Sequence, residues 1–260
     1  MDVAQLFSVR GKTVVVTGGS RGIGLMIATG FVEAGAKVYI CARKADASNA
    51  AAAELSRLGK CISVPADLSS LAGVEGFVEA VAGHEQRVHV LVNNAGATWG
   101  APLEEYPDAA FDKIMAVNVK AIFQLTRLLL PLLRAAASNE DPARVINIGS
   151  IDGLQVPSFA NYAYSASKAA VHMLTRHMAR ELVSDHINVN AIAPGLFPSR
   201  MTAYLLDTPE GHKIVKTTIP MKRIGTPEDI AGTAIYLSSR ASAFLTGVVL
   251  PVAGGQATVN

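Results

Sequence analysis

The sequence predicts one doubly wound α/β domain, in which helices cover both faces of a seven-stranded parallel sheet. The first observation is that short β-branched runs alternate with stretches of helical length along all 260 residues. The second is that most of these runs are continuously apolar, as expected of strands buried on both faces. Repeated strand–helix–strand units of this kind build a parallel sheet. The predicted strands span Thr13–Thr17, Lys37–Cys41, Ser63–Pro65, Val88–Val92, Arg144–Ile148, Asn188–Ile192 and Val248–Val252.

The stretches between the strands are long enough for helices, and no Pro/Gly-rich linker or charge run divides the chain. The last of them has a clear start, because Thr226 offers an N-cap hydroxyl and Pro227 suits the first helical position. Seven strands fill one domain, so residues 1–260 are predicted to form a single unit. The predicted helices include Gly24–Ala34, Ala109–Ala137, Tyr164–Val183 and Pro227–Leu237.

Composition excludes several classes of protein. Half of the residues are hydrophobic and 17% are charged, which is too apolar for a disordered chain. The most apolar stretch, around residues 125–137, is broken by Arg127, Pro131 and Arg134. Since a spanning helix needs ~20 uninterrupted apolar residues, we expect no membrane helix. The opening Met1-Asp2-Val3 carries no basic or apolar signal region, so we expect a cytoplasmic protein.

Charge and cysteine content narrow the partners further. The net charge is +2 and the 23 basic residues are scattered, so a nucleic-acid footprint is not expected. Cys41 and Cys61 cannot build a disulfide framework, and no Cys/His cluster has metal-ligand spacing. We therefore expect neither a nucleic-acid partner nor a metal.

A glycine-rich turn follows the first predicted strand. The sequence Thr17-Gly-Gly-Ser-Arg-Gly-Ile-Gly24 runs directly into a helix. Glycines at positions 18, 22 and 24 allow a tight turn, close approach of a pyrophosphate and close helix–strand packing. A glycine-rich turn without a ligand remains an alternative on this pattern alone.

A tyrosine and a lysine lie four positions apart where a helix begins, and therefore share one of its faces. A free tyrosine, with a pKa of about 10, carries protons poorly at neutral pH. A neighbouring ammonium lowers that pKa, so Lys168 would bring Tyr164 closer to the working pH. The alternative is a packed Tyr/Lys pair without function. Ser150 favours the functional interpretation, because it ends the fifth strand at the edge where ligands bind.

These motifs, taken in order, resemble those of the short-chain dehydrogenase/reductase family over about residues 6–255. The resemblance rests on the glycine turn, Asn93-Asn94-Ala95-Gly96, Ser150, Tyr164-x-x-x-Lys168 and Pro194-Gly195. It implies a Rossmann-type fold and an oxidoreductase with a nicotinamide cofactor. It implies that the cofactor contacts Gly18, Ser20, Arg21, Gly22, Ile23, Gly24, Arg43, Asp67, Leu68, Asn93, Asn94, Ala95, Gly96, Tyr164, Lys168, Pro194, Gly195, Phe197 and Ser199.

The second strand indicates which nucleotide is bound. NAD-selective folds place an acid after this strand to hold the ribose 2′-hydroxyl, but this chain has Ala42 there. Arg43 and Arg21 could both reach a 2′-phosphate, so we expect NADP(H). In this family Asp67 would hydrogen-bond the adenine amino group; the alternative is that Asp67 caps the following helix.

The resemblance also assigns catalytic roles. Tyr164 would deliver a proton to a developing alkoxide, Ser150 would hold the substrate carbonyl and Lys168 would bind the nicotinamide ribose. Asn118 would hold, through its helix backbone, a water that connects Lys168 to solvent. Phe197 and Ser199 would help to fix the carboxamide. Tyr162 lies on the wrong side of the helix, so its replacement by phenylalanine should do much less damage.

Within the family, the chain looks most like the β-ketoacyl reductases linked to rhamnolipid synthesis, which implies a 3-oxoacyl thioester on a carrier protein or coenzyme A. Sugar acids, polyols and hydrophobic ketones stay open as substrates, and a silent NADP-binding regulator is a remote alternative. The spacing from Ser150 to Tyr164 is one residue longer than usual, which affects the loop 155–161. Residues 198–223 should form a substrate lid with apolar and basic side chains, although an ordinary amphipathic helix fits equally well. Trp99 could be pocket wall or core cover. Relatives suggest a homotetramer or a dimer.

Overall fold

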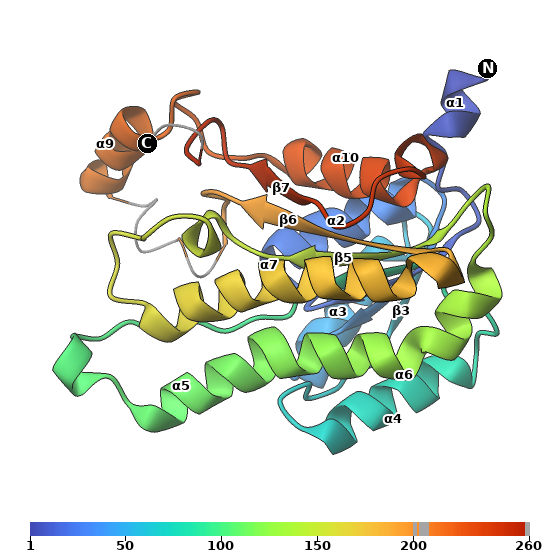
Figure 1. Cartoon of the computed structure of the whole chain (residues 1–260), viewed down its shortest axis with the longest axis horizontal. Coiled ribbons are helices and arrows are strands. Elements are labelled where there is room, and N and C mark those ends of the chain that lie inside the picture. The colour runs from blue at the N-terminus through green and yellow to red at the C-terminus, as the bar shows by residue number, and fades with distance from the viewer. Residues whose placement is uncertain (200–201, 203–207, 258–260) are drawn as a thin grey trace.

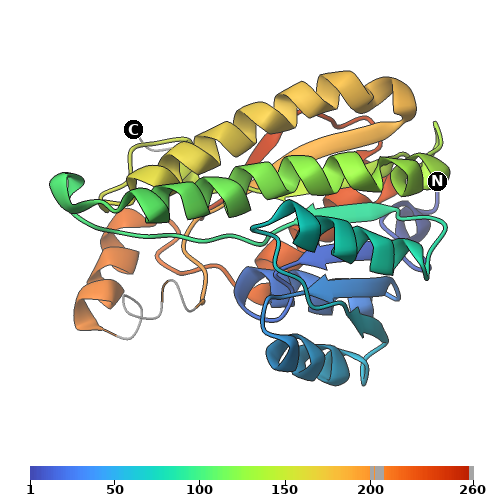
Figure 2. The ribbon, with the colours of Figure 1, turned by 90° about the horizontal axis from the view of Figure 1, so that it is seen from below.

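The computed structural model describes residues 1–199, 202 and 208–257 and confirms the predicted fold class. One sheet holds seven strands in the order β3-β2-β1-β4-β5-β6-β7, and all neighbours are parallel. Helices lie on both faces of this sheet (Figures 1 and 2). The strands are β1 Thr13–Thr17, β2 Lys37–Cys41, β3 Lys60–Ser63, β4 Val90–Asn93, β5 Ala143–Ile148, β6 Ile187–Pro194 and β7 Val249–Val252.

The third strand lies earlier than expected. The prediction was Ser63–Pro65, whereas β3 spans Lys60–Ser63 and pairs with β2 through Cys61 opposite Val38. Beyond Ser63, the backbone N–H groups of Val64 and Ala66 still donate to the carbonyls of Ile40 and Ala42, but no regular strand continues there. The edge strand β7 also differs from expectation, because its residues are only partly buried.

The helices divide between the two faces of the sheet. α2, α3 and α10 contribute to one apolar cluster, and α4, α6 and α7 to the other. In Figure 1, α9 lies beyond the left end of the sheet, where the arrowheads of β6 and β7 point. The helices are α1 Val3–Leu6, α2 Gly22–Glu33, α3 Ala45–Leu55, α4 Leu71–Ala82, α5 Asp108–Met115, α6 Ala121–Ala136, α7 Tyr162–Leu182, α9 Pro209–Thr218 and α10 Pro227–Ser238.

The long helix predicted over Ala109–Ala137 is not uniform. α5 and α6 are joined by a π-helical segment, Ala116–Lys120, and Pro131 lies inside α6. By length and composition alone, the run Asp108–Ala136 is apolar enough to cross a membrane, a test that the core helix of a soluble protein also passes. Its buried residues Leu125, Leu129 and Leu133 pack in the cluster between the sheet and α4, as those of a core helix do.

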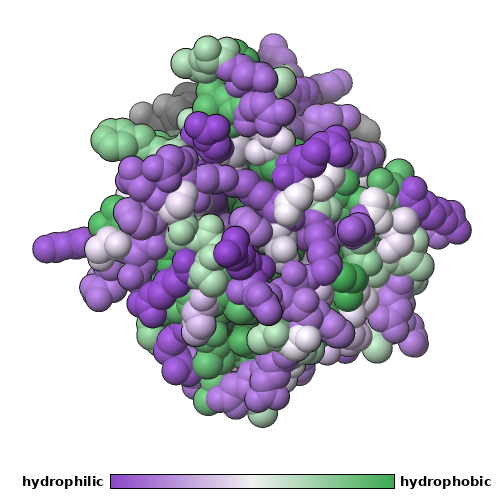
Figure 3. Space-filling model, turned by 90° about the vertical axis from the view of Figure 1, so that its right-hand side faces the viewer, coloured by the Kyte–Doolittle hydropathy of each residue, from purple (hydrophilic) through white to green (hydrophobic). Residues whose placement is uncertain are grey.

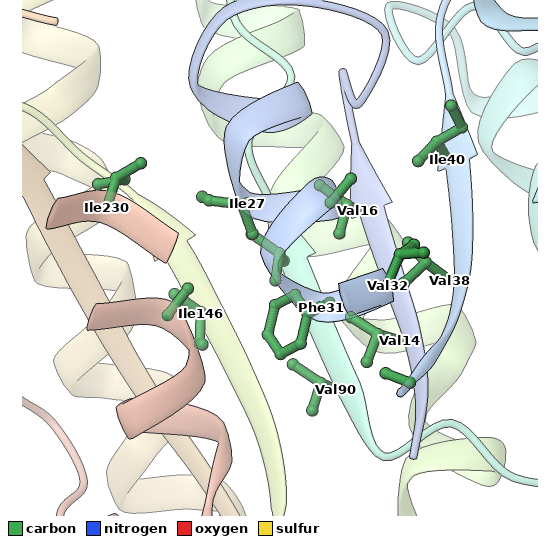
Figure 4. Close-up of a cluster of buried hydrophobic side chains, with 14 of the residues drawn as sticks. Val14, Val16, Ile27, Phe31, Val32, Val38, Ile40, Val90, Ile146 and Ile230 are labelled. Carbon is green, nitrogen blue, oxygen red and sulfur yellow. The ribbon is translucent and has the colours of Figure 1, made fainter. Parts of the chain in front are cut away.

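Alternation along the central strands supplies both halves of the core. In β1, Val14 and Val16 face the side of α2, whereas Val15 faces the side of α6. Figure 4 shows the first cluster, with Ile27 and Phe31 of α2 against strand residues. Burial on both faces explains why these strands read as unbroken apolar runs.

A partly buried ion-pair cluster closes the end of the sheet where the strands begin. The Asp141 carboxylate accepts from Lys12 Nζ at 2.8 Å and lies 3.3 Å from Nη2 of Arg144, which is 1% exposed. The two cations also donate to the carbonyls of Ser238 and Ser239.

Figure 3 shows the side that carries α1, where polar side chains predominate and apolar ones are scattered among them.

Candidate active site

The predicted site residues gather where the strands end. β1 lies between β2 and β4, so the strand order reverses beside it, and this is the position at which open parallel sheets bind ligands. The glycine turn follows β1, Asn94-Ala95-Gly96 follows β4, Ser150 follows β5, and Gly195–Ser199 follows β6. Four separate stretches of sequence therefore meet at one edge.

The glycine turn has backbone angles and close contacts that favour glycine. Gly18 and Gly22 have φ values of +65° and +53°. A Cβ on Gly18 would lie 2.9 Å from Nδ2 of Asn94, and one on Gly24 would lie 2.3 Å from the Gly18 carbonyl oxygen. α2 begins at Gly22, and its N-cap residue Arg21 makes no side-chain cap hydrogen bond. The backbone N–H groups of this helix N-terminus therefore suit a pyrophosphate, so the residues present fit a dinucleotide.

Thr17 joins the glycine turn to the loop after β4. Its Oγ1 accepts from the backbone N–H of Asn94 at 2.9 Å and of Ala95 at 3.0 Å. The Asn94 side chain donates to the Thr17 carbonyl at 2.8 Å. The Asn93 side chain, expected to line the adenosine side, is buried, and its amide donates to Asn147 at 2.9 Å.

The residues proposed for the adenosine end differ in exposure. Arg21 and Arg43 are exposed, whereas the Leu68 side chain is part of the core. Asp67 does not cap α4, because the N-cap of that helix is Ser70. The carboxylate of Asp67 instead accepts from the backbone and hydroxyl of Ser69, and these hydrogen bonds hold its pKa below the usual value.

Ser150, Tyr164 and Lys168 converge. Lys168 is buried, donates from Nζ to the Ile148 carbonyl at 2.8 Å, and lies 5.4 Å from the centre of the Tyr164 ring. The Ser150 hydroxyl hydrogen-bonds Tyr164. α7 begins at Tyr162, two residues earlier than predicted, and Tyr162 is 42% exposed with its ring against Tyr106.

The protonation states differ from the sequence-based expectation. Burial raises the pKa of Tyr164 to about 12, outweighing the Ser150 hydrogen bond, which lowers it. Burial also lowers the pKa of Lys168 to about 8. The expected lowering of the tyrosine pKa by Lys168 is therefore wrong for this chain as it stands. Tyr164 holds its proton at neutral pH and can act as a donor.

Asn118 is fully buried in the π-helical segment. Its Oδ1 accepts from the backbone N–H of Ala97 at 2.8 Å, and its Nδ2 donates to the Ala97 carbonyl at 3.0 Å and to Ser167 Oγ at 2.9 Å. Ser167 donates in turn to the Tyr164 carbonyl at 2.7 Å. Asn118 thus ties the loop after β4 to the helix that carries Tyr164, and π segments are frequent at functional sites.

The loop after β6 approaches the glycine turn. Ser199 lies beside Gly22, since a Cβ on that glycine would be 3.4 Å from the serine Cβ. The Phe197 side chain is core and packs against Gly225, so its backbone is the part available to a cofactor. Pro194 ends β6, and Gly195 N–H donates to the Val252 carbonyl. Of the expected lid, α9 is described, whereas Arg200, Met201, Leu205 and Leu206 lie outside the described residues.

Sequence reasoning missed three residues around Ser150. The turn Ile151–Gly153, which follows this serine, contains Asp152 and is contacted by Asn161 and His172. Asp152 could have been identified as a site residue from the sequence, because it lies only two residues after Ser150. Trp99, which could be pocket wall or core cover, is 51% exposed. Within the described residues, no group of three or more His, Cys, Asp or Glu is placed to hold a metal.

The doubly wound sheet, the glycine turn and the Ser150–Tyr164–Lys168 group together define a nicotinamide-dependent oxidoreductase. The sequence model of the short chain dehydrogenase family matches residues 12–210, and the chain belongs to this family.

This chain is similar in sequence to several named reductases. The chain is 51% identical over 249 residues to the rhamnolipids biosynthesis 3-oxoacyl-[acyl-carrier-protein] reductase of Pseudomonas aeruginosa, covering 96% of this chain and 97% of that protein. It is 34% identical to the 5-keto-D-gluconate 5-reductase of Escherichia coli K12, covering 97% and 98%. Among solved structures, the Pseudomonas aeruginosa RhlG/NADP active-site complex matches with a TM-score of 0.95 at 50% identity, covering 97% and 99%.

Proposed function

We propose that this chain is an NADPH-dependent carbonyl reductase that acts on a 3-oxoacyl thioester. The observation that carries the proposal is the convergence of Ser150, Tyr164 and Lys168 beside a glycine turn that fits a dinucleotide. A tyrosine that is protonated at neutral pH suits reduction, because this direction needs a proton donor.

The chain's own residues bind the carbonyl and deliver the proton. When bound, the reduced nicotinamide supplies a hydride to the carbonyl carbon. Ser150 and the Tyr164 hydroxyl donate hydrogen bonds to the carbonyl oxygen and stabilise its developing negative charge. Tyr164 then gives up its phenolic proton to that oxygen. Lys168 binds the nicotinamide ribose. The helix backbone at Asn118 holds a water that connects Lys168 to solvent, and a proton returns to the site through this water.

The cofactor residues divide by function. Gly18, Ser20, Gly22, Ile23 and Gly24 bind the pyrophosphate with backbone N–H groups. Arg21 and Arg43 bind the 2′-phosphate, and their exposure leaves both side chains free to reach it. Asp67, Leu68, Asn94, Ala95 and Gly96 line the adenosine side. Pro194, Gly195, Phe197 and Ser199 hold the carboxamide, Phe197 through its backbone.

The substrate follows from the relative at 51% identity, whose name gives 3-oxoacyl groups on an acyl carrier protein. We place the substrate lid within residues 198–223, of which 200–201 and 203–207 lie outside the described residues. Its described part offers the apolar side chains Ile214, Ile219 and Met221 and the cations Lys213, Lys216, Lys222 and Arg223. An acyl chain on a phosphate-bearing carrier can use both kinds. The relative that reduces 5-keto-D-gluconate makes sugar acids the competing substrates.

We also propose a cytoplasmic homo-oligomer, either a tetramer or a dimer. Exposed apolar side chains on α5, α6 and α7, including Phe111, Phe123 and Met173, offer a surface for a second copy. Cys41 and Cys61 are free and buried, as is usual in a reducing compartment. Light scattering that gives a monomer mass would exclude the oligomer, and cell fractionation tests the location.

The proposed function is tested by following NADPH and NADH consumption with a series of 3-oxoacyl thioesters of increasing chain length, on coenzyme A and on acyl carrier protein. We expect turnover with NADPH, much less with NADH, and an optimum in chain length. If NADPH binds but no thioester is reduced, the family assignment stands and the substrate proposal is wrong. Panels of sugar acids, polyols and hydrophobic ketones then identify the competing substrate.

A further inference from the structure

Asp152 joins the two segments that carry Ser150 and Tyr164. It lies in the 3-10 turn Ile151–Gly153, and its backbone N–H donates to Ser150 Oγ at 3.1 Å. Its carboxylate accepts from Nδ2 of Asn161 at 3.1 Å. Asn161 is the N-cap residue of α7, three positions before Tyr164, and is 8% exposed. A single side-chain pair therefore links the serine turn to the start of the tyrosine helix.

The other side of this turn rests on a histidine. A Cβ on Gly149 would lie 2.2 Å from Nε2 of His172, and one on Gly153 would lie 2.9 Å from its Cε1. The ring is buried, and burial lowers the pKa of His172 to about 4, so it is neutral under working conditions. The histidine supports the turn but adds no charge to it.

The carboxylate of Asp152 also acts on the reacting pair through its charge. It raises the pKa of Tyr164, because a negative neighbour disfavours a phenolate, and it raises the pKa of Lys168, because the same neighbour favours an ammonium. Other groups around the pair come from three elements: the Ser150 hydroxyl on the serine turn, neutral Asn118 on the π segment, and His172 on α7. Arg176, further along α7, acts on His172. In the described part of the chain, Asp152 is the carboxylate that influences both Tyr164 and Lys168.

We propose that Asp152 is a positioning residue for the reduction: hydrogen-bonded by Asn161, its carboxylate fastens the Ser150 turn to α7 and keeps a negative charge beside Tyr164 and Lys168. The proposal rests on the reductase function proposed above. Its consequence is that Tyr164 keeps a transferable proton, and Lys168 its ammonium, to a higher pH than the site without this carboxylate would allow.

The two parts of the role are separated by two variants. Asp152→Asn removes the charge but leaves an amide oxygen that can accept from Asn161. Asn161→Ala removes the hydrogen bond but leaves the charge. Glu75→Gln is the matched control, because it neutralises an exposed carboxylate on α4. Asp152→Glu, which restores the charge, tests for rescue, and Asp152→Ser provides a second neutral variant if Asp152→Asn does not fold.

The first measurement is kcat/KM for NADPH-dependent reduction from about pH 6 to about pH 10, a range that brackets the pKa of Lys168. We expect the alkaline decline of Asp152→Asn to move to lower pH by about half a unit or more. Asn161→Ala should lose about 3- to 30-fold in kcat/KM, the usual effect of one hydrogen bond. The pH at which its kcat/KM declines should stay near that of the wild type. Asp152→Glu should return the decline toward the wild-type position, and Glu75→Gln should match the wild type.

The second measurement uses no substrate. The NADPH dissociation constant is followed by fluorescence over the same pH range. As the pH is increased, this constant should begin to rise at a lower pH in Asp152→Asn than in the wild type, because Lys168 loses its proton at a lower pH in the variant. This binding test still decides the role of Asp152 if the wild type reduces no thioester, a result that would contradict the substrate proposal alone. An Asp152→Asn protein whose activity and binding keep the wild-type pH dependence would overturn the inference, even if its Tm fell, because a purely structural role would lower Tm alone.

Discussion

Lys168 Nζ donates to the carbonyl oxygen of Ile148, the last residue of β5, while lying 5.4 Å from the centre of the Tyr164 ring. Ile148 is two residues before Ser150, so one buried side chain fixes α7 against the strand end that leads to the serine. The separation of Ser150 and Tyr164 is therefore held by this hydrogen bond, by the packing of α7 on β6 and on the turn Ile151–Gly153, and by the Asp152–Asn161 hydrogen bond.

Cofactor choice should depend on the two exposed arginines of the nucleotide site. Removing Arg43 or Arg21 deletes charge-assisted hydrogen bonds to the 2′-phosphate, each contributing about 1.5–3 kcal/mol. We therefore expect Arg43→Ala to weaken NADPH binding about 10- to 100-fold while leaving NADH binding nearly unchanged. Fluorescence titration with both nucleotides measures this. Equal weakening of NADPH and NADH would contradict the assignment, and Arg57→Ala, an exposed arginine just after α3, is the control.

Asn118 should matter for stability as well as for turnover. Asn118→Ala leaves the partly buried backbone groups of Ala97 and the buried Ser167 hydroxyl without their side-chain partner, at a cost of roughly 1–3 kcal/mol in unfolding free energy. Urea denaturation measures that loss. The residual kcat of the folded variant, compared at equal folded fraction, reports the proton route separately; an unchanged kcat would remove Asn118 from the mechanism.

Asp141 should be the most costly carboxylate to neutralise far from the active site. Asp141→Asn leaves the buried Lys12 and Arg144 without their negative partner; because the Asp141 side chain is itself 33% exposed, the cost lies below the ~3–5 kcal/mol of a fully buried pair. We expect a large fall in Tm with little change in KM of the protein that remains folded. Asp46→Asn, an exposed acid in the first turn of α3, should leave Tm nearly unchanged. Similar Tm values for the two variants would refute this account of the cluster.

The pH dependence of stability should carry the signature of His172. Its folded pKa of about 4 lies below the ordinary value of 6.5, so between these values the unfolded chain takes up a proton that the folded chain refuses. The unfolding free energy should therefore fall by up to about 1.4 kcal/mol per pH unit as the pH drops through this window. Urea denaturation of His172→Gln should show a shallower fall. Parallel curves for wild type and variant would show that the histidine is not the cause.

The fold and the core of the site could be predicted from the sequence because each leaves a local pattern. The middle of β1, Val14-Val15-Val16, is a continuous apolar run, and the glycine turn is dictated by backbone angles that other residues rarely adopt. The edge of β3 was misplaced because a short run beside Pro65 has no strong pattern of its own.

The features that sequence reasoning missed depend on tertiary contacts. The π segment around Asn118 looks like continuous helix in sequence, and only its hydrogen bonds to Ala97 and Ser167 explain it. The pKa of Tyr164 was expected to fall because a charged neighbour is visible in a motif, whereas burial is not. Asp152 and Asn161 are nine positions apart in a loop, and no periodic pattern in the sequence indicates that their side chains form a hydrogen bond.

The central claim is that Tyr164 donates the proton, and a pair of tyrosine variants tests it most directly. Tyr164→Phe and Tyr162→Phe each remove one hydroxyl, two positions apart on the same helix. Single-turnover NADPH oxidation with a 3-oxoacyl thioester should fall by about 10²- to 10⁴-fold in Tyr164→Phe, the usual contribution of a general acid. It should stay near the wild-type rate in Tyr162→Phe, with NADPH binding retained by both. A Tyr164→Phe enzyme that oxidises NADPH at the wild-type rate would contradict the account.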